Sequence, residues 1–184
     1  MNQRGFTLVE LMVVIAVIGV SMAAAFAYMG GKPASTADEA TAAANTLREA
    51  SRKAIAAGAV RQDVAVANAL TERTRVRVAQ EGGLTAIILE RVDEDEGDTT
   101  YAWLELERHW VSQDVELYGY ADESALDPGS VAPTALTGET TVSCYPDGTC
   151  DPKTLFFRNT RNGEQAVRVV VMPCNGSPIV FDGW

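Results

Sequence analysis

Thiol chemistry is available at three positions, Cys144, Cys150 and Cys174, all within residues 144–184 of this 184-residue chain. In the cytosol such cysteines stay reduced, whereas in a domain exported beyond a membrane they permit one disulfide and leave one odd thiol. Cys144 and Cys150 flank the turn 145–149, and a hairpin there would bring them across from each other. We therefore predict that these two pair, with a bridge from Cys174 to either one as the competing arrangement.

The sequence contains no other recognisable set of catalytic or metal-binding residues. The cysteine spacing does not match a four-ligand zinc site, and the single His109 lies far from it in sequence. The acidic segment 93–98 offers oxygen ligands for calcium, but it lacks the EF-hand spacing and its closing glutamate. No nucleophile–base–acid constellation is visible, and His109 fits a surface or partly buried strand position. We predict no enzyme, no metal site and no cofactor.

One carboxylate interrupts a long apolar run. From Phe6 to Met29 the only charged side chain is Glu10. As a helix this run is about 36 Å long, enough to cross a hydrocarbon core of about 30 Å. A carboxylate costs about 2.5–3.5 kcal/mol in lipid on insertion scales, so Glu10 should have a partner. The alternatives are a plain signal anchor and a tolerated carboxyl near the membrane interface.

Residues 4–20, RGFTLVELMVVIAVIGV, resemble the processing signature of type IV prepilins and type II secretion pseudopilins. The resemblance implies cleavage between Gly5 and Phe6 by a membrane prepilin peptidase, which also N-methylates Phe6. It further implies that Glu10, the fifth residue of the processed chain, pairs with the terminal amine of a neighbouring subunit. The residue types agree with these roles. Gly5 lets a protease approach the backbone, and Arg4 holds the leader on the cytoplasmic side.

Three further segments, the helix end 47–55, the turn 146–148 with the strand 154–157, and the hairpin at 175–176, carry a second and weaker resemblance. Through them the rest of the chain resembles the H-type minor pseudopilins and their pilus relatives, the GspH/FimT group. Ala27 stands where major subunits commonly carry a proline, which favours a minor subunit. The acidic insertion 93–98 and the long loop 122–140 depart from the compact pattern of the group.

The residue pattern changes from helical to alternating along the chain. Gly30-Gly31-Lys32-Pro33 predicts a kink or break, after which Ser35 or Thr36 can cap an alanine-rich helix that ends at Gly58 or continues to Thr71. A hairpin is predicted at Glu81-Gly82-Gly83, and an antiparallel meander through the turns Asn162-Gly163 and Asn175-Gly176. Residues 122–140 read as a surface loop. Trp103, Leu104 and Leu106 are the core candidates of the strand at residues 101–111.

These patterns predict an α+β fold, with a long N-terminal transmembrane helix packed on a C-terminal antiparallel β-sheet head. The expected divisions are a leader over 1–5, the transmembrane half of the helix over 6–29, its periplasmic part and connection over 30–72, and a β-rich head over 73–184. The resemblance implies a single-pass inner-membrane protein with a periplasmic head.

The resemblance predicts a structural subunit that assembles into a pseudopilus or type IV pilus. Its partners would be other pilins or pseudopilins, the prepilin peptidase and the inner-membrane assembly platform. The alternative is a minor pilin whose head binds a ligand such as DNA or a surface. Residues 81–139 hold fifteen Asp and Glu against two Arg, which argues against nucleic acid because phosphate binding needs clustered basic residues.

Overall fold

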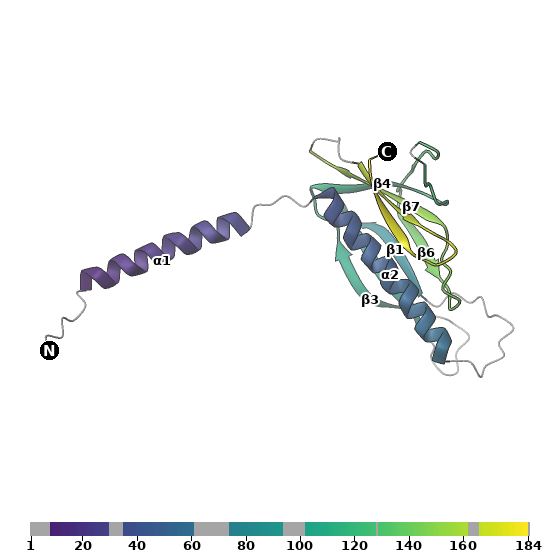
Figure 1. Cartoon of the computed structure of the whole chain (residues 1–184), viewed down its shortest axis with the longest axis horizontal. Coiled ribbons are helices and arrows are strands. Elements are labelled where there is room, and N and C mark those ends of the chain that lie inside the picture. The colour runs from purple at the N-terminus through teal and green to yellow at the C-terminus, as the bar shows by residue number, and fades with distance from the viewer. Residues whose placement is uncertain are drawn as a thin grey trace. The chain divides into compact units, whose positions relative to one another are not determined.

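The computed structural model describes residues 8–29, 35–60, 74–93, 102–127, 129–161 and 166–183, and divides the chain into two units, Met1–Pro33 and Ala34–Trp184. Helix α1 (Leu8–Met29) forms the first unit, and helix α2 (Thr36–Val60) with the strands forms the second (Figure 1). Helices followed by antiparallel sheets confirm the α+β class. The strands are β1 Thr74–Glu81, β2 Leu84–Asp93, β3 Ala102–Trp110, β4 Val115–Ala121, β5 Thr134–Ala135, β6 Glu139–Cys144, β7 Lys153–Asn159, β8 Ala166–Val171 and β9 Pro178–Asp182.

The predicted transmembrane span over residues 6–29 is not confirmed. Within the described residues, no helix reaches the length and apolarity needed to cross a membrane. The glycine and proline cluster at 30–33, where a kink was predicted, lies outside the described residues.

Helix α2 begins at a serine cap and buries an alanine face. The Oγ of Ser35 accepts a hydrogen bond from the Ala37 N–H at 3.2 Å, and its carbonyl accepts from the N–H groups of Asp38 and Glu39. The small side chains let α2 lie close to strands of both sheets, and it ends at Val60, near the predicted stop at Gly58. Residues 61–73, which the longer alternative requires, are not described. The buried face of α2 consists of Ala40, Ala43, Ala44, Leu47, Ala50 and Ala54.

The first sheet has the strand order β3-β2-β1-β6, all antiparallel. Its predicted hairpin is confirmed: β1 and β2 join through Gly82 and Gly83, whose φ angles of 59° and 85° suit residues without a β carbon. A register shift between Leu89 and Glu90 marks a bulge in the pairing of β2 with β3.

The second sheet has the order β5-β4-β7-β8-β9. Strands β7, β8 and β9 form the predicted meander, with Phe156, Arg168 and Phe181 opposite one another. The turn at Asn175-Gly176 is present, with Gly176 at a φ of 57°. The other predicted turn, Asn162-Gly163, lies outside the described residues.

Two pairings link segments that are distant in sequence. Strand β6 pairs with β1, and β4 pairs with β7, so the chain crosses from the first sheet to the second twice. The inner faces of both sheets and the alanine face of α2 share one core, which includes Leu47, Val76, Leu117 and Phe157. Burying apolar side chains from three layers in one core is the main stabilising term of the head.

Two sequence predictions need correction. Leu104 was predicted to lie in the core, but it is 40% exposed because β3 is an edge strand; Leu106 does pack against the core, and Trp103 is half-buried. The segment 122–140 is not simply a surface loop. It contains β5 and the start of β6, and its residue Ala125 is buried, with its N–H donating to Thr154 Oγ1 at 2.9 Å. Of the acidic segment 93–98, only Asp93 is described, at the end of β2.

Candidate functional site: the apolar helix and the cysteines of the head

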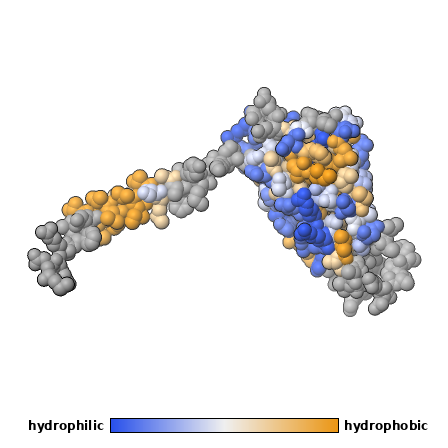
Figure 2. Space-filling model, viewed as in Figure 1, coloured by the Kyte–Doolittle hydropathy of each residue, from blue (hydrophilic) through white to orange (hydrophobic). Residues whose placement is uncertain are grey.

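Helix α1 presents apolar side chains around its described surface. Leu8 is 71% exposed and Val20 is 72% exposed, and Figure 2 shows this part of the helix as a nearly continuous apolar surface. A helix that is hydrophobic all round is stable only when another apolar phase covers it. The exposed large side chains are Leu8, Val9, Leu11, Met12, Val13, Val14, Ile15, Val17, Ile18, Val20 and Met22.

Of the predicted processing and docking residues, the structure describes only Glu10. Glu10 is in the first turn of α1 and is the only charged residue of the element. Gly5 and Phe6 lie outside the described residues. Glu10 therefore stands at the N-terminal end of an apolar helix, a position that favours a negative charge near the free N–H groups.

The structure joins Cys144 and Cys150 by a disulfide, the pairing predicted from the sequence. Cys144 ends β6, and the intervening turn closes through a hydrogen bond from the Tyr145 N–H to the Thr149 carbonyl at 2.8 Å. Gly148 takes a φ of 87°, which a residue without a β carbon adopts most easily. Asp147 accepts hydrogen bonds from the hydroxyl of Thr149 at 2.7 Å and from its N–H at 2.9 Å, and these hold the pKa of Asp147 below its ordinary value.

The disulfide lies where the chain crosses from the first sheet to the second. The Asp151 N–H donates to the Ser143 carbonyl at 2.8 Å, and the Cys150 N–H donates to the Pro173 carbonyl at 3.3 Å, in the turn between β8 and β9. Cys150 also lies against Gly176 of that turn, which in turn contacts Ser51 of α2. The third cysteine, Cys174, is an exposed free thiol in the same turn.

His109 links β3 to the first turn of α2. Its Nε2 lies 2.7 Å from Oε2 of Glu39, whose other oxygen accepts the Ser112 N–H at 3.2 Å. The side chain of Glu39 is nearly buried, so both of its oxygens have partners in the fold. His109 is thus a partly buried strand residue with a structural partner.

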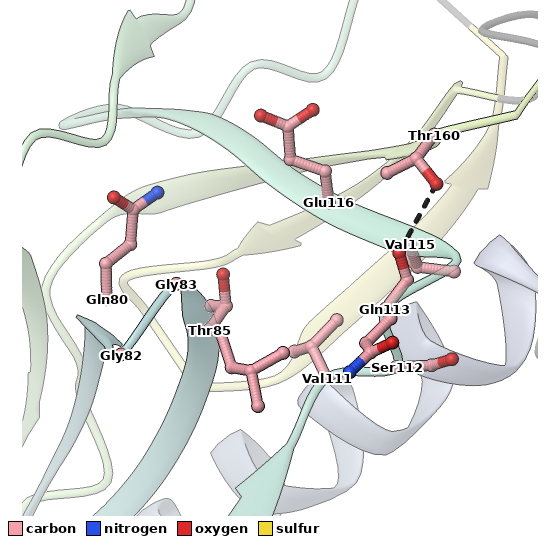
Figure 3. A pocket seen from close by; sticks show the side chains of 11 residues that line it. Gln80, Gly82, Gly83, Thr85, Val111, Ser112, Gln113, Val115, Glu116 and Thr160 are labelled. Atoms are coloured by element: carbon pink, nitrogen blue, oxygen red, sulfur yellow. Dashed lines mark hydrogen bonds between the residues drawn. The ribbon is translucent and has the colours of Figure 1, made fainter.

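A pocket of about 490 Å³ opens between the β1–β2 turn and the β3–β4 connection (Figure 3). Its polar lining includes Gln80, Thr85 and Gln113, whose carbonyl accepts the Thr160 hydroxyl at 3.3 Å. The carboxylate in the lining, Glu116, already accepts the Arg158 Nε–H at 2.9 Å. The described residues that line it include no thiol, imidazole or lysine.

An arginine–glutamate network on the first sheet was not found from the sequence. The carboxylate of Glu90 accepts hydrogen bonds from Arg75 at 2.6 Å and from Arg77 at 2.9 Å, and Arg75 lies 3.9 Å from the centre of the Trp103 ring. Burial disfavours the charged form of Arg77, but the hydrogen bond and charge of Glu90 outweigh this, and the pKa of Arg77 is raised. Part of the acidic charge of residues 81–139 is therefore neutralised within the fold. The alternation of Arg75 and Arg77 on β1 was the available signal.

Comparison with protein-family models gives a match at the N-terminus. Residues 1–26 match the family model described as the prokaryotic N-terminal methylation motif, a type IV pilin-like signal. This motif implies, in general terms, processing by a prepilin peptidase and assembly with other pilins. No curated protein and no solved structure matches the chain.

Proposed function

We propose that this chain is a minor subunit of a pseudopilus or type IV pilus, of the H type, which serves protein secretion or pilus biogenesis. The observation that carries the proposal is the continuity between the methylation motif at residues 1–26 and a helix whose described large side chains are apolar and exposed. Removing apolar surface from water stabilises by about 25 cal/mol per Å², so this helix is strongly favoured in lipid or among other apolar helices over water.

Cleavage between Gly5 and Phe6 would create a positive amine at Phe6. In a growing filament, that amine would pair with Glu10 of a neighbouring subunit and so set the axial register between the two chains. The pairing offsets the penalty of placing a carboxylate among apolar helices. Before assembly, the N-terminal helix would hold the chain at the inner membrane.

The head would supply lateral contacts in the periplasm. The disulfide between Cys144 and Cys150 supports an oxidising compartment for this unit. We propose that the chain is not an enzyme. The assembly platform and other subunits would supply the chemistry that drives filament assembly. Ala27, in the place where major subunits commonly carry proline, supports a minor rather than a major subunit.

Intact mass of the chain, extracted from cells with an active prepilin peptidase, tests the proposal. We expect loss of Met1 to Gly5 and the gain of one methyl group on Phe6. Replacement of Gly5 by Phe should leave the precursor uncleaved, because the bulky side chain blocks the approach of the protease. An unprocessed wild-type chain in these cells would overturn the proposal.

A further inference from the structure

The turn that carries Cys174 covers one sulfur of the disulfide. The turn closes through a hydrogen bond from the Gly176 N–H to the Met172 carbonyl at 3.0 Å. A β carbon built on Gly176 would lie 2.6 Å from Sγ of Cys150, so the backbone of this turn contacts that sulfur directly. On the other side of Cys174, the Pro173 carbonyl accepts the Cys150 N–H at 3.3 Å. Pro173 and Gly176, on either side of Cys174 in the turn, therefore both contact Cys150.

These contacts bring the backbone of Cys174 close to Cys150 of the bridge. The Pro173 carbonyl oxygen and the Cα of Cys174 belong to one planar peptide unit, so the hydrogen bond keeps the Cα atoms of Cys150 and Cys174 within about 7 Å. Disulfides span Cα separations up to about this value. Cys174 is exposed, whereas Cys144 and Cys150 are buried. The thiolate is the form of a cysteine that attacks a disulfide, and Cys174 is the exposed cysteine.

We propose that Cys174 is a thiol–disulfide exchange site that moves the cross-link of the head. The Cys174 thiolate attacks Sγ of Cys150, a bond forms between these two sulfurs, and the bond between Cys150 and Cys144 breaks. Cys144 leaves as a thiolate and takes up a proton from solvent, which balances the proton that Cys174 loses. The reaction replaces one disulfide by another, so it consumes no oxidant or reductant.

The two bridges constrain different parts of the head. The bond between Cys144 and Cys150 closes the turn at the end of β6, within one short segment. A bond between Cys150 and Cys174 would instead tie the segment before β7 to the β8–β9 turn. It would remove the cross-link from the end of β6, which pairs with β1 in the first sheet. The exchange would therefore move the covalent link from the first sheet into the second. This inference does not depend on the filament assignment.

Two variants of the full chain, each with one cysteine replaced by serine, test the reaction in mild detergent. Cys144→Ser leaves Cys150 and Cys174, and Cys150→Ser leaves Cys144 and Cys174. Each is incubated with oxidised glutathione and mapped without reduction after cleavage at Asp147. We expect the bridge between Cys150 and Cys174 to form about tenfold faster than the bridge between Cys144 and Cys174, because contact raises the effective thiol concentration. Equal rates, or no bridge between Cys150 and Cys174, would overturn the proposal.

The wild-type chain provides a second test if a variant does not fold. The protein is equilibrated at pH 8 without reductant for hours, the timescale of uncatalysed rearrangement, and its free thiols are then trapped by alkylation. We expect alkylated Cys144 beside alkylated Cys174, and no alkylated Cys144 in a Cys174→Ser variant. Alkylation confined to Cys174 in the wild-type chain, or alkylated Cys144 in the Cys174→Ser variant, contradicts the exchange.

Discussion

Gly176 and Cys150 approach so closely that a β carbon on Gly176 would lie 2.6 Å from the cysteine sulfur and 2.8 Å from the hydroxyl oxygen of Ser51. Three segments meet at this glycine: the β8–β9 turn, the disulfide and helix α2. Its φ of 57° also lies in the left-handed region, where a side chain is strained. Both effects require a residue without a side chain.

Gly176→Ala should therefore destabilise the head by about 2–4 kcal/mol, the sum of left-handed strain and overpacking. Urea unfolding of the full chain in mild detergent measures this loss of unfolding free energy. Gly83→Ala is the matched control, because Gly83 has a φ of 85° but open space around its β position. The control should cost only about 1 kcal/mol. Equal losses in the two variants would show that packing against Cys150 adds nothing.

Loss of the Cys144–Cys150 bridge should lower the free energy of unfolding by about 2 kcal/mol in the chain-entropy model, because the closed loop is short. The Cys144→Ser, Cys150→Ser double variant shows this in the same urea experiment, with Cys174→Ser as the control that leaves the bridge intact. Peptide mapping of the unreduced wild-type chain identifies the bridge. A double variant as stable as the wild-type chain would show that the bridge does not stabilise the head.

Among the carboxylates of the first sheet, Glu90 should be the one whose substitution lowers the free energy of unfolding most. Its side chain is 6% exposed and accepts hydrogen bonds from both Arg75 and Arg77. Glu90→Gln removes the counter-charge of Arg75 and the nearest of the three carboxylates around Arg77, so it should cost about 3 kcal/mol. Glu116→Gln removes the exposed pair with Arg158 and should cost less than about 1 kcal/mol. If Glu116→Gln costs as much as Glu90→Gln, burial is not what makes the Glu90 pairs important.

Local signals were enough to predict several parts of the head. The β1–β2 hairpin follows from Gly82 and Gly83, and the β7–β9 meander from alternating residues and the turn at Asn175-Gly176. The pairing of Cys144 with Cys150 was also predictable, because the two cysteines flank one short turn. In each case the residues that decide the structure are close together in sequence.

Contacts between distant segments could not be predicted in this way. Nothing within β6 or β4 specifies β1 or β7 as its neighbour, and that choice depends on how the whole core packs. The partner of His109 is Glu39, about seventy residues away on α2. Leu104 was misassigned because alternation identifies a strand but not its edge position. The N-terminal methylation motif could be recognised from one sequence because its signature is contiguous.

The last prediction concerns Glu10, the only charged residue of α1, and separates a filament subunit from a plain anchored protein. Among apolar helices a carboxylate persists only when it is paired or protonated. A lone helix offers Glu10 only its own N-terminus, whereas a filament offers the amine of a neighbour. Glu10→Ala should therefore abolish co-assembly, measured as lost cross-links to partner subunits and reduced secretion or piliation.

Processing and extraction from the membrane fraction should persist in Glu10→Ala, since the cleavage site at Gly5 is separate and the cost of burying a carboxylate is gone. Glu10→Gln isolates the charge, because it keeps the shape and removes the attraction to the amine. Ser21→Ala, which removes an exposed polar group from the same helix without changing its charge, should assemble like the wild-type chain. If both Glu10 variants also assemble normally, Glu10 is not a docking group. The subunit would then fit the filament tip, where no neighbour lies above it to recognise.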